Sequence, residues 1–180
     1  GDTLDGAIYG IVARFSDATI VGLNITDSQY YGVYGLGQGT LSIQDTVVVG
    51  DPDTTASVAD DSWGARNNYA GSGIFAWVDD VSIIDTSVTG YNNSGITIKE
   101  YDAGVAWLER VSTEDTGRHG IWLSGSDTTF VDVTIWGVRE VEDQGEEICY
   151  TVDRYAAVVS GENSLDWTGG GIYDSAGYGL

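Results

Sequence analysis

The sequence predicts an all-β protein, a single-stranded right-handed parallel β-helix (β-solenoid) of about six to seven coils with two loop insertions. Three observations predict this fold: a repeat of about 22 residues, short β-rich runs inside each repeat, and turn residues that separate the runs. The 180 residues are assigned to a single domain, 1–180, because this length suits one hydrophobic core.

One unit of the repeat places apolar or β-branched residues at its first, fourth and sixth positions. It occurs five times, and successive copies begin 23, 40, 25 and 22 residues apart: Ile20/Leu23/Ile25, Ile43/Thr46/Val48, Ile83/Thr86/Val88, Leu108/Val111/Thr113 and Phe130/Val133/Ile135. Strands stacked at ~4.8 Å would bring equivalent positions of successive copies together. The residues expected to stack in register in the core are Ile20, Ile43, Ile83, Leu108 and Phe130.

A second unit, a small residue followed by a β-rich pair, falls between copies of the first. It begins at Gly10, Gly32, Gly73, Gly95 and Gly120, with a sixth copy at Ala156. Short β-branched or aromatic runs between Gly, Asn, Asp and Ser are typical of strands joined by turns. A period of about 22 residues leaves room for three such strands in each coil.

Two over-long intervals in the repeat locate insertions at 50–72 and 138–154. Each follows the third strand of a repeat and precedes the Gly or Ala unit, so both should leave the fold at the same corner. Long loops on one edge of a repeat scaffold commonly carry recognition residues.

Stretches such as VSIIDTSVTGYNNSGITI and DGAIYGIVARFSDATIVGLNIT carry the pattern of a known superfamily. The chain resembles the right-handed parallel β-helix superfamily, whose members include pectate-lyase-like enzymes, adhesins and surface-layer proteins. The resemblance covers nearly the whole chain and implies the fold. It does not imply one activity, because this scaffold hosts unrelated functions.

The composition is strongly acidic, with 28 Asp and Glu against 7 Lys and Arg and a formal net charge of -21. Such a field repels phosphate backbones and anionic headgroups, which argues against nucleic acid as a partner. No apolar run approaches the ~20 residues of a membrane span, so no membrane insertion is expected. The acidic, lysine-poor surface favours an extracellular or cell-surface location.

The first insertion contains the metal candidates, because carboxylate oxygens are the ligands that calcium prefers. They are Asp51, Asp53, Asp60 and Asp61, and the alternative is a solvated acidic loop. Calcium is the one cofactor considered, and the sequence requires none. The only cysteine, Cys149, is a candidate for an intermolecular disulfide, and the alternative is a buried, reduced thiol.

The only histidine, His119, lies in TGRHGIWLSGS, which resembles the Gly-His-Gly segment of polygalacturonases, a β-helix family of glycoside hydrolases. The resemblance would imply a catalytic cluster of carboxylates near this residue. The nearest counterparts of the family's other motifs depart from its spacing or order: Asn24-Ile25-Thr26-Asp27, Asp79-Asp80 and Ile98-Lys99. We therefore assign no catalytic residue and interpret His119 as a turn residue.

Flat aromatic rings stack on sugar rings, so exposed tryptophans are candidates for polysaccharide binding. Trp122 and Trp136 each lie between inward-facing residues of a strand and should point outward. Trp63 and Tyr69, in the first insertion, complete the binding candidates. Packing against protein would explain these aromatic residues equally well.

Both ends of the repeat array lack the atypical polar unit that commonly shields terminal strands. Unshielded strands invite pairing with another copy, and the alternative is that neighbouring segments of a longer chain supply the caps. We therefore expect a structural, self-associating protein, a homo-oligomer or polymer, of an extracellular surface layer, sheath or fibre. In the alternative, the chain is a polysaccharide lyase or glycoside hydrolase, or a carbohydrate-binding β-helix fragment of one.

Overall fold

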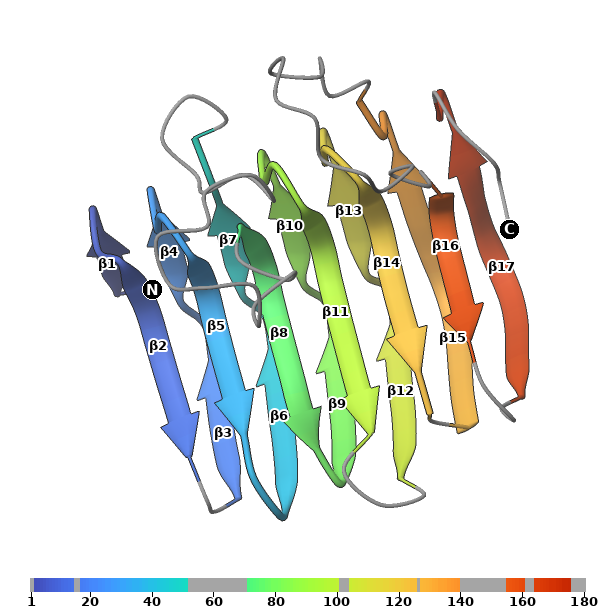
Figure 1. Ribbon diagram of the computed structural model, residues 1–180, viewed down its shortest axis with the longest axis horizontal. Coiled ribbons are helices and arrows are strands. Elements are labelled where there is room, and N and C mark those ends of the chain that lie inside the picture. The colour runs from blue at the N-terminus through green and yellow to red at the C-terminus, as the bar shows by residue number, and fades with distance from the viewer. Residues whose placement is uncertain are drawn as a thin grey trace, which may run out of the picture.

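The computed structural model describes residues 2–14, 17–51, 71–100, 104–125, 127–139, 155–160 and 164–175. Within these ranges the chain forms strands and no helix, and every strand pairing is parallel (Figure 1). The prediction of an all-β chain with parallel strands is therefore confirmed. A search of the same ranges finds no helix that is long and apolar enough to cross a membrane.

One layer of the molecule is a six-stranded sheet in the order β16-β14-β11-β8-β5-β2. Its strands are β2 (Tyr9–Arg14), β5 (Tyr31–Leu36), β8 (Ser72–Val78), β11 (Ser94–Glu100), β14 (His119–Ser124) and β16 (Tyr155–Ser160). In Figure 1 they run side by side across the front of the molecule, from blue to orange-red.

The other layer is an eleven-stranded sheet whose two limbs meet in β15 (Asp127–Trp136). The first limb also contains β3 (Ala18–Val21), β6 (Thr40–Gln44), β9 (Asp80–Ile84) and β12 (Val105–Glu109). The second limb also contains β1 (Thr3–Asp5), β4 (Asn24–Thr26), β7 (Val47–Val49), β10 (Ser87–Thr89) and β13 (Ser112–Glu114). The long strand β17 (Leu165–Tyr173) pairs with both halves of β15 and so extends both limbs.

Each repeat supplies one strand to the six-stranded sheet, then one to the first limb and one to the second limb. Because each strand pairs with its equivalent one repeat later, equivalent residues form columns that cross the sheet. The predicted column is confirmed in register and is buried along its length: Ile20, Ile43, Ile83, Leu108 and Phe130. Trp167 of β17 continues it.

The corner between the two limbs requires a left-handed backbone. Asp45, Asp85, Arg110 and Asp132 occupy it in successive repeats, with φ between 50° and 54°. Aspartate suits this corner because its short side chain tolerates the left-handed region. Arg110 is the exception among the four. Its guanidinium donates a hydrogen bond of 2.8 Å from Nη2 to Oδ2 of Asp85, one repeat earlier, and this contact lowers the pKa of Asp85.

The glycine unit of the repeat is explained by the close approach of the two layers. A Cβ atom at Gly73 would lie 2.1 Å from Cγ1 of Val88, and one at Gly32 would lie 2.2 Å from Cγ1 of Val48. The buried Tyr91 ring also approaches both glycines. A residue with a side chain would therefore push the layers apart at these positions.

Both insertions connect the second limb to the six-stranded sheet, as their place in the repeat predicts. Residues 50–71 separate β7 from β8, so Ser72, which was assigned to the first insertion, already belongs to β8, and residues 137–154 separate β15 from β16. At the two departures, the backbone N–H groups of Gly50 and Gly137 each donate to a carbonyl of the next strand in the second limb. Both insertions therefore leave from the same row of stacked corners.

Substitution of Ile83 by Asp should destabilise the protein by about 4 kcal/mol or more, because it places an unpaired carboxylate in the buried column. The matched control is Ile84→Asp, since Ile84 is the next residue along β9 and its side chain is only half-buried. Urea denaturation followed by circular dichroism measures both free energies of unfolding. Equal losses in the two variants would contradict the assignment of the inward face.

Candidate interaction surfaces

The inward-facing columns of residues become more exposed to solvent at the edges of the sheets. One column of the second limb comprises Leu4, Ile25, Val48, Val88, Thr113, Ile135 and Ile172. Its interior members are at most 1% exposed, whereas Leu4 in β1 is 39% exposed and Ile172 in β17 is half-buried. Part of the apolar core is therefore displayed at each edge.

The other columns behave in the same way. Ile11 in β2 is half-buried, whereas its equivalent Val33 in β5 is fully buried. Trp167 in β17 is half-buried, whereas its equivalent Phe130 in β15 is fully buried. We call β1, β2 and β3 the N-terminal edge, and β16 and β17 the C-terminal edge.

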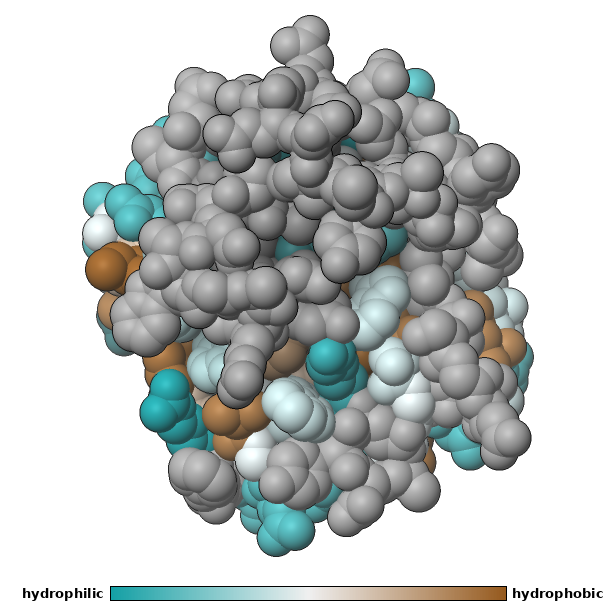
Figure 2. Space-filling model, in the orientation of Figure 1, coloured by the Kyte–Doolittle hydropathy of each residue, from teal (hydrophilic) through white to brown (hydrophobic). Residues whose placement is uncertain are grey.

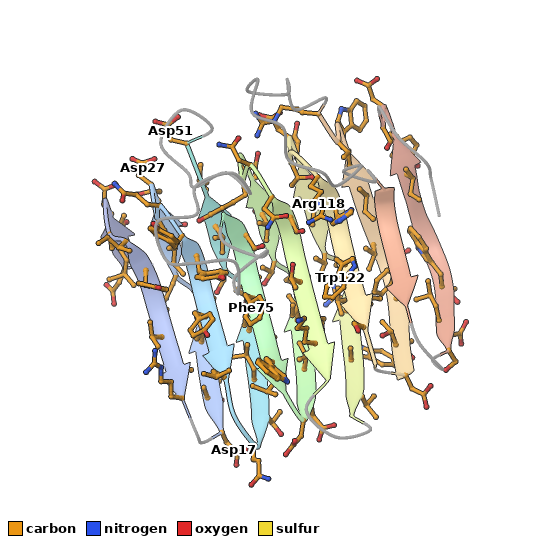
Figure 3. The ribbon with its side chains drawn as sticks, in the orientation of Figure 1. Asp17, Asp27, Asp51, Phe75, Arg118 and Trp122 are labelled. Carbon is orange, nitrogen blue, oxygen red and sulfur yellow. The ribbon has the colours of Figure 1, made fainter. Side chains whose placement is uncertain are left out.

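The outer face of the six-stranded sheet carries aromatic side chains from neighbouring strands. The ring centroids are 5.8 Å apart for Tyr9 and Tyr31, 4.9 Å for Tyr31 and Tyr34, and 5.3 Å for Tyr34 and Phe75. Figure 3 labels Phe75 on β8, in the middle of this sheet. These rings pack on one another, and two of them, those of Tyr31 and Phe75, are buried. In the lower part of Figure 2, apolar side chains show between hydrophilic ones on this side of the molecule.

Trp122 of β14 lies on the same outer face, so its predicted outward direction is confirmed. Its ring already has a charged partner. The Nζ atom of Lys99 lies 5.6 Å from the ring centroid of Trp122 and 5.6 Å from that of Trp77. A cation between two indole rings is a stabilising arrangement, so the faces of Trp122 and Trp77 that meet this ammonium group serve the fold.

His119 is not a turn residue, and this interpretation of the sequence was wrong. It is the first residue of β14, and it is only 5% exposed. Its register partner in β11 is Ser94, and its backbone N–H donates to the carbonyl oxygen of Asn93 at 3.2 Å. Gly120, which follows His119, lies inside β14 and not in a turn. Glycine is typical of turns, and this is why the sequence around His119 was interpreted as one.

Trp136 differs from Trp122 in being open to solvent. It ends β15 on the outer face of the second limb and is 49% exposed. Its ring centroid lies 5.6 Å from that of Tyr173, which is 48% exposed, and the ring planes meet at 31°. Two depressions, of about 260 Å³ and about 470 Å³, lie against Trp136 and Glu114. The outward direction predicted for Trp136 is confirmed.

The candidate metal residue that the structure describes, Asp51, is half-buried near other carboxylates. Partial desolvation, the neighbouring Asp5 and then Asp51 raise the pKa of Asp27. Thr26 donates a hydrogen bond of 2.7 Å from Oγ1 to Asp5. Among the described residues, no group of three or more His, Cys, Asp or Glu is arranged to hold a metal ion.

Several predicted site residues lie outside the described residues. They are the metal candidates Asp53, Asp60 and Asp61, the binding candidates Trp63 and Tyr69, and the disulfide candidate Cys149. The roles assigned to them remain predictions.

The sequence analysis missed the pairing of Trp136 with Tyr173. The signal was present, because LDWTGGGIY aligns with the strand that contains Phe130 and Trp136. The insertion between these two segments hid it, since it places Tyr173 37 residues after Trp136 instead of one regular period later.

Comparison with models of protein families, with curated proteins and with solved structures finds no match for this chain. In its described residues, the chain is an all-β protein whose parallel strands form two sheets. Its function must therefore be argued from its own surfaces.

Substitution of Asp27 by Asn should raise the melting temperature at pH 7. The folded state raises the pKa of Asp27, so the contribution of this group to stability is lost as the pH rises through its folded pKa. Asn keeps the left-handed backbone (φ 55°) and removes the charge. The gain should shrink as the pH falls and should vanish below the ordinary aspartate value of 3.8, where the carboxyl group becomes protonated in both states.

The control for this experiment is Asp45→Asn, which makes the same change at another exposed corner residue with positive φ (50°). Calorimetry at pH 7, 5 and about 3.5 compares the variants. A gain in Asp45→Asn equal to that in Asp27→Asn would attribute the effect to backbone preference and not to carboxylate repulsion.

Proposed function

We propose that the described strands form a right-handed parallel β-helix of about six to seven coils, with one coil for each repeat. Three features support this. Each repeat visits the six-stranded sheet, the first limb and the second limb in turn. All pairings are parallel and join equivalent positions of successive repeats. At the corner between the limbs, equivalent backbone N–H groups donate to a carbonyl of the next repeat, from Gly22 to Gln44, from Asp45 to Ile84 and from Asp85 to Glu109.

We further propose that the protein is an extracellular structural component that self-associates into a surface layer, sheath or fibre. The observation that carries this proposal is the exposure of core columns at both edges. An edge strand offers unpaired backbone groups, and here it also offers apolar side chains whose equivalents inside the sheets are buried. A second copy that continues the pairing would cover both at once.

Pairing of β1 with the second half of β17 in the next copy keeps the strand direction, but it leaves a gap of one strand between β2 and β16 and between β3 and the first half of β17. β1 projects farthest, because the second limb has one more strand than the first limb. Continued register would place Leu4 beside Ile172 and Asp5 beside Tyr173 of the neighbouring copy. No two carboxylates face each other in these pairs, so the large negative charge does not oppose the contact locally.

The extracellular location rests on the surface chemistry. A net charge of -21 with a single lysine keeps hydration water and counterions at the surface, which suits an exposed, saline setting. A polysaccharide lyase or glycoside hydrolase is the second candidate. It would require catalytic carboxylates beside the scissile bond, whereas the register partners of His119 in the two neighbouring strands are Ser94 and Tyr155.

Substitution of Leu4 by Lys should weaken self-association, because a charge would replace the apolar side chain at the projecting edge. Val47→Lys is the matched control. Val47 has the same 39% exposure and lies in the second limb, but its strand is paired on both sides. Sedimentation velocity over a range of concentrations measures the size of the particles, and circular dichroism checks that both variants are folded.

Three outcomes of this experiment are informative. Association that is lost in Leu4→Lys and retained in Val47→Lys supports the edge contact. Equal association in both variants would move the contact away from β1. A wild-type chain that stays monomeric at every concentration would refute the structural proposal.

Cys149→Ser tests whether a disulfide adds to the assembly. Its neighbours Glu146, Glu147 and Asp153 in the sequence should disfavour the thiolate, so the thiol is a poor nucleophile but can still pair under oxidising conditions. We expect the oxidised wild-type assembly to survive a higher urea concentration than Cys149→Ser, and reductant to abolish the difference. Identical resistance in both proteins would exclude the cross-link.

A further inference from the structure

The outer face of the second limb contains a shallow trough beside Trp136. Its floor is a row of small residues at equivalent positions of successive strands: Ser87, Ser112, Thr134 and Gly171. Its wall is the next outward row: Thr89, Glu114, Trp136 and Tyr173. The depression of about 260 Å³ lies where Ser112, Glu114, Thr134 and Trp136 form the four corners of a square.

The wall of the trough combines two partly exposed aromatic rings with an exposed carboxylate. The side chains of Trp136 and Tyr173 are about half exposed, unlike that of Trp122, which packs against Lys99. No ion pair or hydrogen bond within the described part of the chain engages the carboxylate of Glu114. The floor adds two half-buried hydroxyl groups, from Ser112 and Thr134.

The trough continues on the other side of Trp136. There the depression of about 470 Å³ is bounded by Glu114, Asp115, Arg139 and Asp174 among others. Arg139 is held by Asp115, with 2.6 Å between Nε and Oδ1, so its charge is largely neutralised. Both depressions share Trp136 and Glu114, so they adjoin each other along the outer face, while part of the indole ring packs against Tyr173.

We propose that this trough binds a neutral oligosaccharide. The C–H groups on the face of a pyranose ring carry partial positive charge and pack on the negative face of an aromatic ring. The sugar hydroxyl groups would donate to Glu114 and exchange hydrogen bonds with Ser112 and Thr134, so every polar group of the square gains a partner.

The charges around the trough select among sugars. Glu114 and Asp174 are exposed carboxylates, and they belong to a chain with a net charge of -21. An acidic sugar such as a uronate would be repelled by them. A basic peptide would be attracted by the carboxylates, but the hydroxyl floor would gain little from it. The neutral saccharide is the ligand that uses the floor and the wall together.

The test is an NMR titration of the ¹⁵N-labelled full chain, with the indole N–H signal of Trp136 assigned from Trp136→Phe. The neutral probes are cellohexaose, xylohexaose and mannohexaose. Trigalacturonate is the anionic probe, and an arginine-containing tetrapeptide is the basic probe. We expect at least one neutral probe to shift the Trp136 signal, and Trp136→Ala to weaken its binding about tenfold.

Trp107→Ala is the matched control, because Trp107 is also an exposed tryptophan of the eleven-stranded sheet (39%), and it should leave the affinity unchanged. Its indole N–H donates to Glu109, and Glu109 is paired with Arg110. Glu114→Gln should preserve the binding of the neutral probe within about threefold, since an amide oxygen can accept the same hydroxyl.

Three results would overturn the proposal: no neutral probe shifts the Trp136 signal, Trp136→Ala binds as the wild type does, or only the uronate or the tetrapeptide binds. The residues proposed to hold the sugar, Ser112, Glu114, Thr134 and Trp136, lie on β13 and β15, which are paired on both sides, whereas the proposed contact between copies joins β1 to β17. Failure here would therefore leave the self-association proposal standing, and a monomeric wild type would leave this one standing.

Discussion

Parallel pairing between equivalent positions of successive repeats is the constraint from which the rest of this structure follows. When each strand bonds to the strand one repeat later, a residue that faces inward once must face inward in every repeat, because a shift of one residue would turn the whole strand over. Ile43 thus lies between Ile20 and Ile83, and the column is buried from Ile20 to Phe130. Each repeat is stabilised by its neighbours and not by itself, since one repeat cannot enclose an apolar interior.

The same constraint governs the corners. Stacked strands require stacked turns, so a left-handed residue recurs at the corner between the limbs. Aspartate fills that corner in most repeats, and part of the acidic composition is therefore structural in origin. The repulsion between these carboxylates is small because the corners are exposed to solvent and because Arg110 forms an ion pair with Asp85 of the preceding repeat. The raised pKa of Asp27 shows the opposite case, in which carboxylates gather without a cation.

The constraint also determines which surfaces are free for other molecules. Columns that are buried inside the sheets must end somewhere, and the two edges expose apolar residues and backbone groups together. The outward rows repeat as the inward rows do, so a run of small residues beside a run of large ones becomes a trough across several strands. One pairing rule therefore creates both the edge that is proposed to meet another copy and the trough that is proposed to bind an oligosaccharide.

The sequence by itself determined the inward columns, the place of the insertions and the all-β class. These features depend on local spacing, and a period of two along a strand and of one repeat between strands can both be counted in a single sequence. The outward direction of Trp122 and Trp136 followed from the same count. Only the tertiary structure decided what each of these side chains meets. Lys99 approaches Trp122 because β11 and β14 are neighbours in the sheet, and Tyr173 reaches Trp136 across an insertion. His119 is buried at the start of β14 for a similar reason, since the exposure of a side chain depends on its neighbours in space and not on its place in the sequence. Contacts between side chains depend on distances in three dimensions, and the spacing of residues along one chain does not contain them.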